Sequence, residues 1–533
     1  MNSAVAMTWA VVLVALGACT PSEQDGASSD DLTSLEGAEY LIEYDAFVYV
    51  DRHADDDAIR WAVARQIKSS LGALRERGIG VMDRDARTNL DGAGWVRTPL
   101  TVVNAGGVNA EDVLRVTYRY RDTALVDRDR RPQGPIDLTL LAGDYAGRYA
   151  DLVPACVDDP QPYADSLWYH YHPGRSACRN KISNERLAIA NATQALEDPN
   201  TQIARIDRDR LFMPTRAVLT PVADPPTLYP EYDRLWGFSG NTSRTHLVAY
   251  AFFGVDRDEA DPGDYGLREL MRFQRTLRTR FPALRVVRTE PFGMLLDFWV
   301  RGQKLDGITF DQVERWVLQG TGWPAGVTTS ADRAELLGQV VERFSERWIY
   351  WDLPVRVSAN GASRDMTVQL RVFYGYEDGS PEIRQRARWR YLEAFWHGDV
   401  FAYTGHSHFG HGPLEPFGYG TENFPDRYQV MLVNSCLSFN YYDQDFLDMH
   451  PAGSAQLDVV TNGLAAYWHG MGAATAGYIA GLIDGEGKSW REVLEGMRVD
   501  LPWERGYDPM RAVNGELDNV FDGAGIDLAV TPR

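Results

Sequence analysis

The sequence predicts an α/β protein, with a mostly parallel sheet flanked by helices in the C-terminal half and a β-rich N-terminal domain before it. From Arg244 onward, short apolar runs alternate with amphipathic segments, which is typical of the strands and helices of a parallel sheet. Between residues 38 and 205, apolar and polar residues alternate in several segments, which indicates half-buried strands. The chain has 533 residues, 44% of them hydrophobic, enough for two or more packed domains.

The first 37 residues are interpreted as an export signal followed by a flexible tether. The apolar stretch Ala4–Ala18 is too short to span a bilayer and suits a signal peptide. Residues 1–19 end in Leu16-Gly17-Ala18-Cys19, which resembles a bacterial lipobox, so lipidation of Cys19 is expected; a plain cleaved signal peptide is the alternative. Residues 20–37, rich in Ser, Asp and Gly, form the tether. We therefore expect an exported protein of the bacterial cell envelope, an outer-membrane lipoprotein or a periplasmic protein, with a membrane attachment through its N-terminal lipid anchor.

Residues 38–240 are expected to form the β-rich domain. The periodicity predicts a helix over Asp57–Arg77 and strands over Tyr40–Val50, Leu114–Tyr120 and Ile136–Leu141. His170 and His172 lie on one face of a segment that is predicted to be extended, where two imidazoles could bind a metal. Because no third ligand accompanies them, an aromatic packing strand is the preferred interpretation.

The four cysteines separate into different expected roles. Cys156 and Cys178 lie 22 residues apart, and an oxidising compartment would let them form a disulfide that closes a loop. With Cys19 acylated and those two paired, Cys436 is left as the one free thiol. A free thiol in an exported protein is a candidate for reactivity.

Residues 241–533 carry the alternating pattern that predicts the parallel sheet. Strands are expected at His246–Phe253, Leu284–Thr289, Leu295–Val300, Val400–Tyr403, Tyr428–Val433 and Gly463–Tyr467. Helices are expected at Tyr265–Phe281, Arg333–Trp348, Pro381–Trp396, Met471–Ile483 and Ser489–Met497. A hairpin is expected over Leu353–Tyr376, with its turn at Asn360-Gly361.

Two of these strands end beside residues with catalytic chemistry. Val400–Tyr403 leads to His406, and Tyr428–Val433 leads to Cys436. The carboxyl ends of parallel strands form the reactive edge of an open sheet, so the imidazole and the thiol are expected to meet there. Thiolate catalysis requires this pair, since the thiol needs a base to activate it and an acid to protonate the leaving group.

The order of these features resembles a known family. An apolar strand, Gly405-His406-Ser407, a loop, a second apolar strand and Cys436 are similar to the caspase-like cysteine peptidases, most of all their gingipain and clostripain branch. The resemblance covers Tyr391–Met497, about a fifth of the chain. It implies a caspase-like layered fold for the domain over residues 241–533.

The resemblance also implies an activity and the residues that perform it. Cys436 would be the nucleophile and His406 the general acid and base of a cysteine endopeptidase that acts on polypeptides without a cofactor. Backbone N–H groups of Ser407 and Cys436 would form the oxyanion hole. Ser407 stands where the family usually has Gly, and Ser435 stands where it often has Ala or Gly. Both serines are small enough for a close backbone approach. Asp399 and Asp443 are the two candidates to orient His406.

Two other functions remain open. His406, His408 and His411 have a spacing similar to the metallo-β-lactamase motif His-x-His-x-Asp-His, which implies a zinc-dependent hydrolase, although Gly410 stands in the place of the aspartate. A catalytically inactive caspase-like binding module is the third possibility, because fold does not fix function. The presence of both His406 and Cys436 favours the peptidase.

The charge of the chain bounds its partners. The net charge of −21 argues against nucleic acid, which binds clustered Lys and Arg, and against an electrostatic hold on anionic lipid. It favours cationic substrates through long-range attraction. Two acidic loops, Asp83–Asp91 and Asp256–Asp264, lack the spacing of an EF-hand and are interpreted as solvated turns.

Overall fold

The structure is a computed structural model, and its description covers part of the chain. The described residues are 32–81, 94–104, 109–157, 167–239, 243–256, 260–290, 293–359, 361–376, 380–410, 412, 414–523 and 528–533. The expected signal peptide and Cys19 lie outside the described residues, as does most of the expected tether. So do His411 and the acidic loop Asp83–Asp91.

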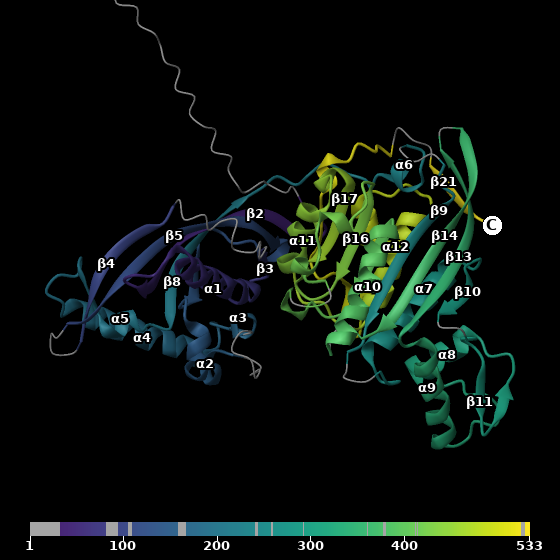
Figure 1. The fold of residues 1–533 in the computed structure, drawn as a ribbon, viewed down its shortest axis with the longest axis horizontal. Helices are drawn as coiled ribbons and strands as arrows, with labels where there is room; N and C mark the ends of the chain where they lie inside the picture. The colour runs from purple at the N-terminus through teal and green to yellow at the C-terminus, as the bar shows by residue number, and fades with distance from the viewer. Residues whose placement is uncertain are drawn as a thin grey trace, which may run out of the picture.

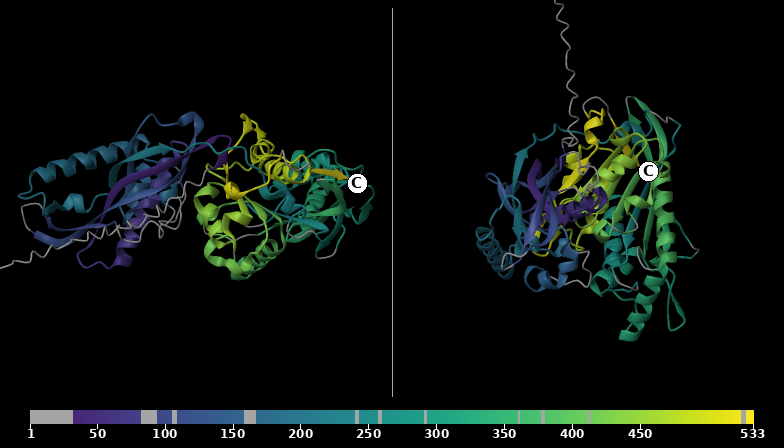
Figure 2. Two further views of the ribbon diagram at one scale, coloured as in Figure 1. Left: turned by 90° about the horizontal axis from the view of Figure 1, so that it is seen from above. Right: turned by 60° about the vertical axis from the view of Figure 1, so that its left-hand side comes forward.

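The strands form two large sheets, and each sheet with its helices is a separate unit (Figures 1 and 2). The N-terminal unit, residues 37–221, contains a seven-stranded sheet. The C-terminal unit contains a ten-stranded sheet and, apart from β1 (Thr33–Ser34), comes from residues after 221. Since β1 pairs with a strand near the C-terminus, part of the segment that the sequence assigns to the tether belongs to the C-terminal unit.

The N-terminal unit is built on two long antiparallel strands, β2 (Gly37–Asp51) and β5 (Asn109–Asp127). The strand order is β6-β8-β2-β5-β4-β7, with β3 also paired to β5. The other strands are β3 (Ile79–Val81), β4 (Val96–Val103), β6 (Ile136–Leu141), β7 (Gln202–Ala204) and β8 (Phe212–Pro221). Alternate residues of β2 are buried against the apolar stripe of α1 (Asp56–Arg75). Asp55 caps the N-terminus of α1, because its side chain accepts a hydrogen bond from Ala58 N. The remaining helices are α2 (Tyr149–Cys156), α3 (Leu167–His170), α4 (Ser176–Gln194) and α5 (Arg205–Arg208).

The large sheet of the C-terminal unit has five parallel strands at its centre. In order across the sheet these are β17 (Leu457–Asn462), β16 (Gln429–Asn434), β15 (Val400–Thr404), β9 (His246–Gly254) and β14 (Ala362–Gly375). Antiparallel strands extend both edges: β20 (Arg511–Asn514) and β1 on one side, and β13 (Arg347–Ala359), β10 (Arg285–Glu290) and β21 (Ala529–Pro532) on the other. The sheet is therefore mixed, and only its centre has the parallel arrangement that the sequence predicts.

Helices cover both faces of this sheet, because successive strand residues point to opposite sides. On one face Phe401 and Val433 pack with α10 (Pro381–His397) and α11 (Ser438–Met449). On the other face Ala402 and Leu432 pack with α7 (Tyr265–Arg280), α12 (Met471–Ile483) and α13 (Trp490–Glu495). The result is a three-layer α/β/α arrangement. The unit also contains the helices α6 (Tyr232–Leu235), α8 (Phe310–Gln319) and α9 (Ser330–Phe344). Two short hairpins complete it: β11 (Phe298–Val300) with β12 (Gln303–Leu305), and β18 (Val499–Leu501) with β19 (Glu504–Tyr507).

Several expected elements are wrong in place or type. The strand expected at Gly463–Tyr467 is a loop, and the strand β17 lies just before it, because both stretches are short and apolar and only pairing with β16 separates them. The helix expected to reach Trp348 ends at Phe344. The segment around His170 is not extended, since Leu167–His170 form the helix α3.

Candidate active site

Cys436 lies in a sharp turn between the end of β16 and the start of α11. The next residue, Leu437, has a φ of 53°, in the left-handed region that costs a non-glycine residue energy. The N–H of Leu437 donates to the carbonyl of Leu464 at 3.1 Å, which holds this conformation. The turn thus places the thiol at the carboxyl edge of the parallel strands.

The thiol of Cys436 is half-buried and lies against the carbonyl of Ala466. Its Sγ donates to the carbonyl oxygen of Ala466 at 3.3 Å. Burial raises the pKa of the Cys436 thiol above its ordinary value, while the contact with Ala466 and the positive charge of Arg75 act in the opposite direction. A thiol in this state requires a base before it can act as a nucleophile.

His406 lies at the end of the neighbouring strand. Thr404 of β15 pairs with Asn434 of β16, and His406 and Cys436 each follow by two residues. Their backbones therefore leave the sheet about 4.8 Å apart, the spacing of adjacent strands. The His406 side chain is 45% exposed and packs edge-on against Trp468, with ring centroids 5.1 Å apart. Within the described residues no hydrogen bond joins His406 to Cys436 directly.

A third strand end brings a carboxylate to His406. Asp256 follows β9, which pairs with β15 on the side away from β16, and its Oδ1 lies 3.0 Å from His406 Nε2. The N–H of Asp256 donates to Asp264 Oδ2 at 2.9 Å, which fixes the start of this loop. Asp256, His406 and Cys436 thus leave three consecutive parallel strands at the same edge. The sequence assigned Asp256 to a solvated turn, and its position just after a buried strand was the available signal.

The two carboxylates that the sequence proposes as partners of His406 lie elsewhere. Asp399 is at the opposite end of β15, where it accepts from Arg244 at 2.6 Å and from Val248 N at 2.8 Å. Asp443 is buried in α11 and accepts from Thr461 Oγ1 and Asn514 Nδ2, both at 2.6 Å. Both have structural partners, so the prediction that either orients His406 is wrong.

A buried polar network fixes the strand ends beneath the site. Asn434 Nδ2 donates to Thr475 Oγ1 and to the carbonyl of Met471, both at 3.1 Å. Asn462 Nδ2 donates to Asn434 Oδ1 at 3.1 Å and to the carbonyl of Ser435 at 2.9 Å. Thr404 and Thr475 share a hydrogen bond of 2.8 Å. These contacts tie β15, β16, β17 and α12 together directly below His406 and Cys436.

The resemblance assigns the oxyanion hole to the backbone N–H groups of Ser407 and Cys436, and this assignment stays a prediction. Neither the N–H of Ser407 nor that of Cys436 donates to another described residue. The flanking carbonyls are held, since Tyr403 Oη donates to His406 O at 2.6 Å and Tyr442 Oη donates to Ser407 O at 2.5 Å. The carbonyls that flank the two N–H groups are therefore fixed by tyrosine hydroxyls.

Aromatic rings form a continuous row that begins at His406. Centroid distances of 5.1 to 6.4 Å join neighbouring rings of the row. The row runs through His406, Trp468, Tyr265, His469, Trp503, Tyr467 and Tyr507. Trp503 is 59% exposed and Tyr467 is 49% exposed, so the row offers a surface for apolar or cationic side chains.

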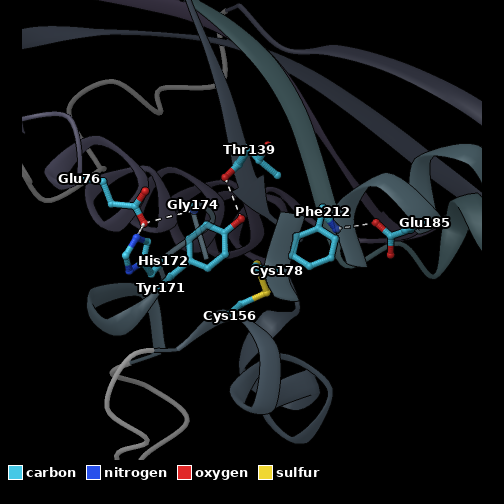
Figure 3. The surroundings of a disulfide bond; sticks show 9 residues. All are labelled: Glu76, Thr139, Cys156, Tyr171, His172, Gly174, Cys178, Glu185 and Phe212. Carbon is cyan, nitrogen blue, oxygen red and sulfur yellow. Dashed lines mark hydrogen bonds and ion pairs between the residues drawn. A yellow bond between two sulfur atoms is a disulfide. The ribbon is translucent and has the colours of Figure 1, made fainter. Parts of the chain in front are cut away.

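The other sequence-predicted site residues have separate places. Cys156 and Cys178 form a disulfide, with Cα atoms 4.7 Å apart (Figure 3). His172 Nε2 lies 2.8 Å from Glu76 Oε1, so its partner is a carboxylate rather than a metal pair with His170. Among the described residues, no group of three His, Cys, Asp or Glu side chains has a metal-binding arrangement, although His411, part of the expected zinc motif, lies outside them.

Comparisons with known proteins add no relative. No family model matches the chain, and neither the curated proteins nor the solved structures give a significant match. Across the described residues, none of the helices has the length and apolar character needed to cross a bilayer.

Proposed function

We propose that the protein is a cysteine endopeptidase that hydrolyses peptide bonds through Cys436, His406 and Asp256. The observation that carries this proposal is the placement of a thiol, an imidazole and a carboxylate at the ends of three consecutive parallel strands. The order of the motif along the chain, with its resemblance to the caspase-like peptidases, supports the same assignment. Asp256 extends the two-residue site expected from the sequence to three residues.

The geometry suggests how the proton moves. With Nε2 of His406 on Asp256, only Nδ1 is available to take the proton of the Cys436 thiol. The thiol must first rotate away from the carbonyl of Ala466. The Asp256 carboxylate stabilises the imidazolium that forms, and the thiolate attacks the carbonyl carbon of the scissile bond.

The later steps use the same groups. The N–H groups of Ser407 and Cys436 bind the oxyanion of the tetrahedral intermediate. Imidazolium His406 donates its proton to the departing amine, which leaves a thioester on Cys436. Water then attacks the thioester while His406 takes its proton, and the carboxylic acid product and the free thiol are released.

The proposed context is the bacterial cell envelope, with polypeptides as substrates and a lipid anchor at Cys19. A chain with a net charge of −21 attracts cationic peptides and repels nucleic acid. The aromatic row beside His406 provides ring faces for cationic or apolar side chains.

The test is peptide-library cleavage followed by mass spectrometry. Wild type and Cys436→Ala, both lacking the anchor segment, are incubated with the library in a thiol reductant, with and without EDTA. We expect cleavage by wild type alone, resistance to EDTA and loss after thiol alkylation. Cleavage that survives Cys436→Ala and stops with EDTA would favour a zinc hydrolase, and the absence of any cleavage would favour a binding module.

A further inference from the structure

We propose that the N-terminal unit is a permanent wall of the active site and supplies Tyr169 and Arg75 beside Cys436. The inference rests on the proposed role of Cys436 as a nucleophile. In this proposal Arg75 is a positioning residue for the thiolate. The N-terminal unit stays in place in the active enzyme and is not removed to activate it.

The N-terminal sheet packs against the loop that holds Cys436. This loop, residues 463–466, accepts hydrogen bonds from Leu437 N and from the thiol itself. Gly80 of β3 lies so close to it that an added Cβ would be 2.8 Å from the carbonyl oxygen of Gly463. A Cβ on Gly463 would be 2.8 Å from Leu125 Cδ2 of β5. Two glycines thus permit direct contact between the backbones of the two units, where β3 and α11 face each other (Figure 1).

Helix α3 continues this contact to the catalytic side. Trp168 is buried and packs edge-on against Tyr441 of α11, with ring centroids 6.0 Å apart. The next residue is Tyr169, whose pKa is raised by burial and, to a smaller extent, by a negative charge on the Cys436 sulfur. The guanidinium of Arg75 lies over the Tyr169 ring, 4.6 Å from its centroid.

Arg75 therefore brings a permanent positive charge to the thiol. In the structure it acts against burial by lowering the pKa of Cys436. His406 carries its positive charge only after it has taken a proton, whereas Arg75 is charged throughout the reaction. A cation from the N-terminal unit therefore stabilises the thiolate.

The N-terminal unit is attached too firmly to act as a removable cover. One apolar core contains residues of α1 and β2 together with residues of α10, α11, β15 and β16. Before the unit, β1 is fixed in the large sheet, where Thr33 N donates to Glu516 Oε1 at 2.8 Å and Ser34 Oγ donates to Arg511 O at 2.5 Å. The unit is thus anchored by its core and by the chain at its start as well as by the chain that leaves it.

Helix α3 is itself held in place by two links (Figure 3). The Cys156–Cys178 disulfide closes the segment that contains Trp168 and Tyr169. Glu76, which directly follows α1, contacts His172 Nε2 at 2.8 Å and accepts from Gly174 N at 3.4 Å. These links hold the Tyr169 ring next to Arg75 at the end of α1.

The first test measures the reactivity of Cys436 without relying on peptidase activity. Iodoacetamide alkylation of Cys436 is followed by peptide mass spectrometry across a range of pH in wild type, Arg75→Gln, Arg75→Lys and the matched control Arg77→Gln. Arg77 is exposed and donates to the carbonyl of Asp137, away from the site. We expect Arg75→Gln to move the alkylation profile to higher pH and to slow the reaction severalfold at neutral pH, with Arg75→Lys near wild type and Arg77→Gln unchanged. An unchanged profile in Arg75→Gln would overturn the assignment.

The second test asks whether the wall is permanent. A recognition sequence for a specific protease is inserted in residues 222–230, the irregular segment that leaves the N-terminal unit, and the purified full chain is cut there. We expect both fragments to elute together on size exclusion and to retain the alkylation profile and the peptide cleavage of the uncut protein. Separation of the fragments with a rise in cleavage would identify a removable cover and contradict the inference. If the uncut wild type cleaves no peptide, the proposed function fails, whereas the elution and alkylation results still decide the inference.

Discussion

Asp256 Oδ1 lies 3.0 Å from His406 Nε2. Replacing one carboxylate oxygen of Asp256 therefore tests its proposed role as the third residue of the site. Asp256→Asn keeps the shape of the side chain but removes the charge that stabilises the imidazolium. We expect kcat/KM for a cleaved peptide to fall about 10- to 100-fold, because general acid and base catalysis by His406 is impaired. Thermal unfolding should change little, since Asp256 lies at a strand end. Unchanged kinetics would remove Asp256 from the mechanism.

His406 and His408 form a matched pair for separating two chemistries. Their rings lie 5.8 Å apart, but of the two only His406 contacts Asp256 in the described structure. We expect His406→Ala to lower the turnover of the peptidase by about 100-fold or more. The variant His408→Ala should remain within severalfold of wild type, because His408 has no step in the thiolate mechanism. A zinc hydrolase would instead lose activity in both variants, and after treatment with EDTA only the wild type would recover activity with added zinc.

At the scale of the secondary-structure elements, the site depends on strand ends that are held in register. Asn462, at the end of β17, donates to Asn434 Oδ1 and to the carbonyl of Ser435, the residue before Cys436. Helix α12 adds Thr475 on the other side of Asn434. The strand ends that carry His406 and Cys436 are therefore held by buried amides and hydroxyls rather than by the loops alone.

The variant Asn462→Ala tests this support. It leaves the buried Oδ1 of Asn434 and the carbonyl of Ser435 without the donor they have now, so we expect a loss of about 1–3 kcal/mol in the free energy of unfolding by urea. Turnover should also fall, since the turn that carries Cys436 loses a contact. Gln444→Ala is the control, because its side chain bonds only to exposed Asp448 within the described residues. Equal stability of the two variants would show that the network does not support the strand ends.

The elements also show what the sequence could predict. The strands β9, β15 and β16 are predictable because each is an uninterrupted apolar run, and the placement of His406 and Cys436 after two of them follows directly. Asp256 could not be assigned to His406, because the pairing of β9 with β15 crosses about 150 residues that separate the two strands in sequence. Helix α11 was missed because its polar and aromatic residues, among them Asn440 and Tyr441, are buried by tertiary contacts that local periodicity does not reveal.

At the scale of the whole molecule, strong acidity coexists with buried carboxyl groups. The net charge of −21 lies mainly on the surface, but Asp458, Glu231 and Glu516 are buried together near the start of β17 and the end of β20. Asp458 Oδ2 accepts from Tyr428 Oη and Asn519 Nδ2, both at 2.6 Å. Buried carboxyl groups of this kind make the stability of the fold depend on pH.

Asp458 determines the direction of that dependence. Burial raises the pKa of Asp458 from 3.8 to about 7, against the hydrogen bonds that it accepts. The folded protein therefore keeps a proton that the unfolded chain releases above about pH 4. The stabilisation from this group is complete below that pH and is lost as the pH rises towards 7.

We expect the Tm of wild type to fall more between about pH 5 and about pH 8 than the Tm of Asp458→Asn, which has no proton to lose. Asp448→Asn is the control, because it removes one exposed charge from α11 and leaves Asp458 in place. Its Tm should fall with pH as steeply as that of wild type. A parallel fall in wild type and Asp458→Asn would instead assign the dependence to the surface charge.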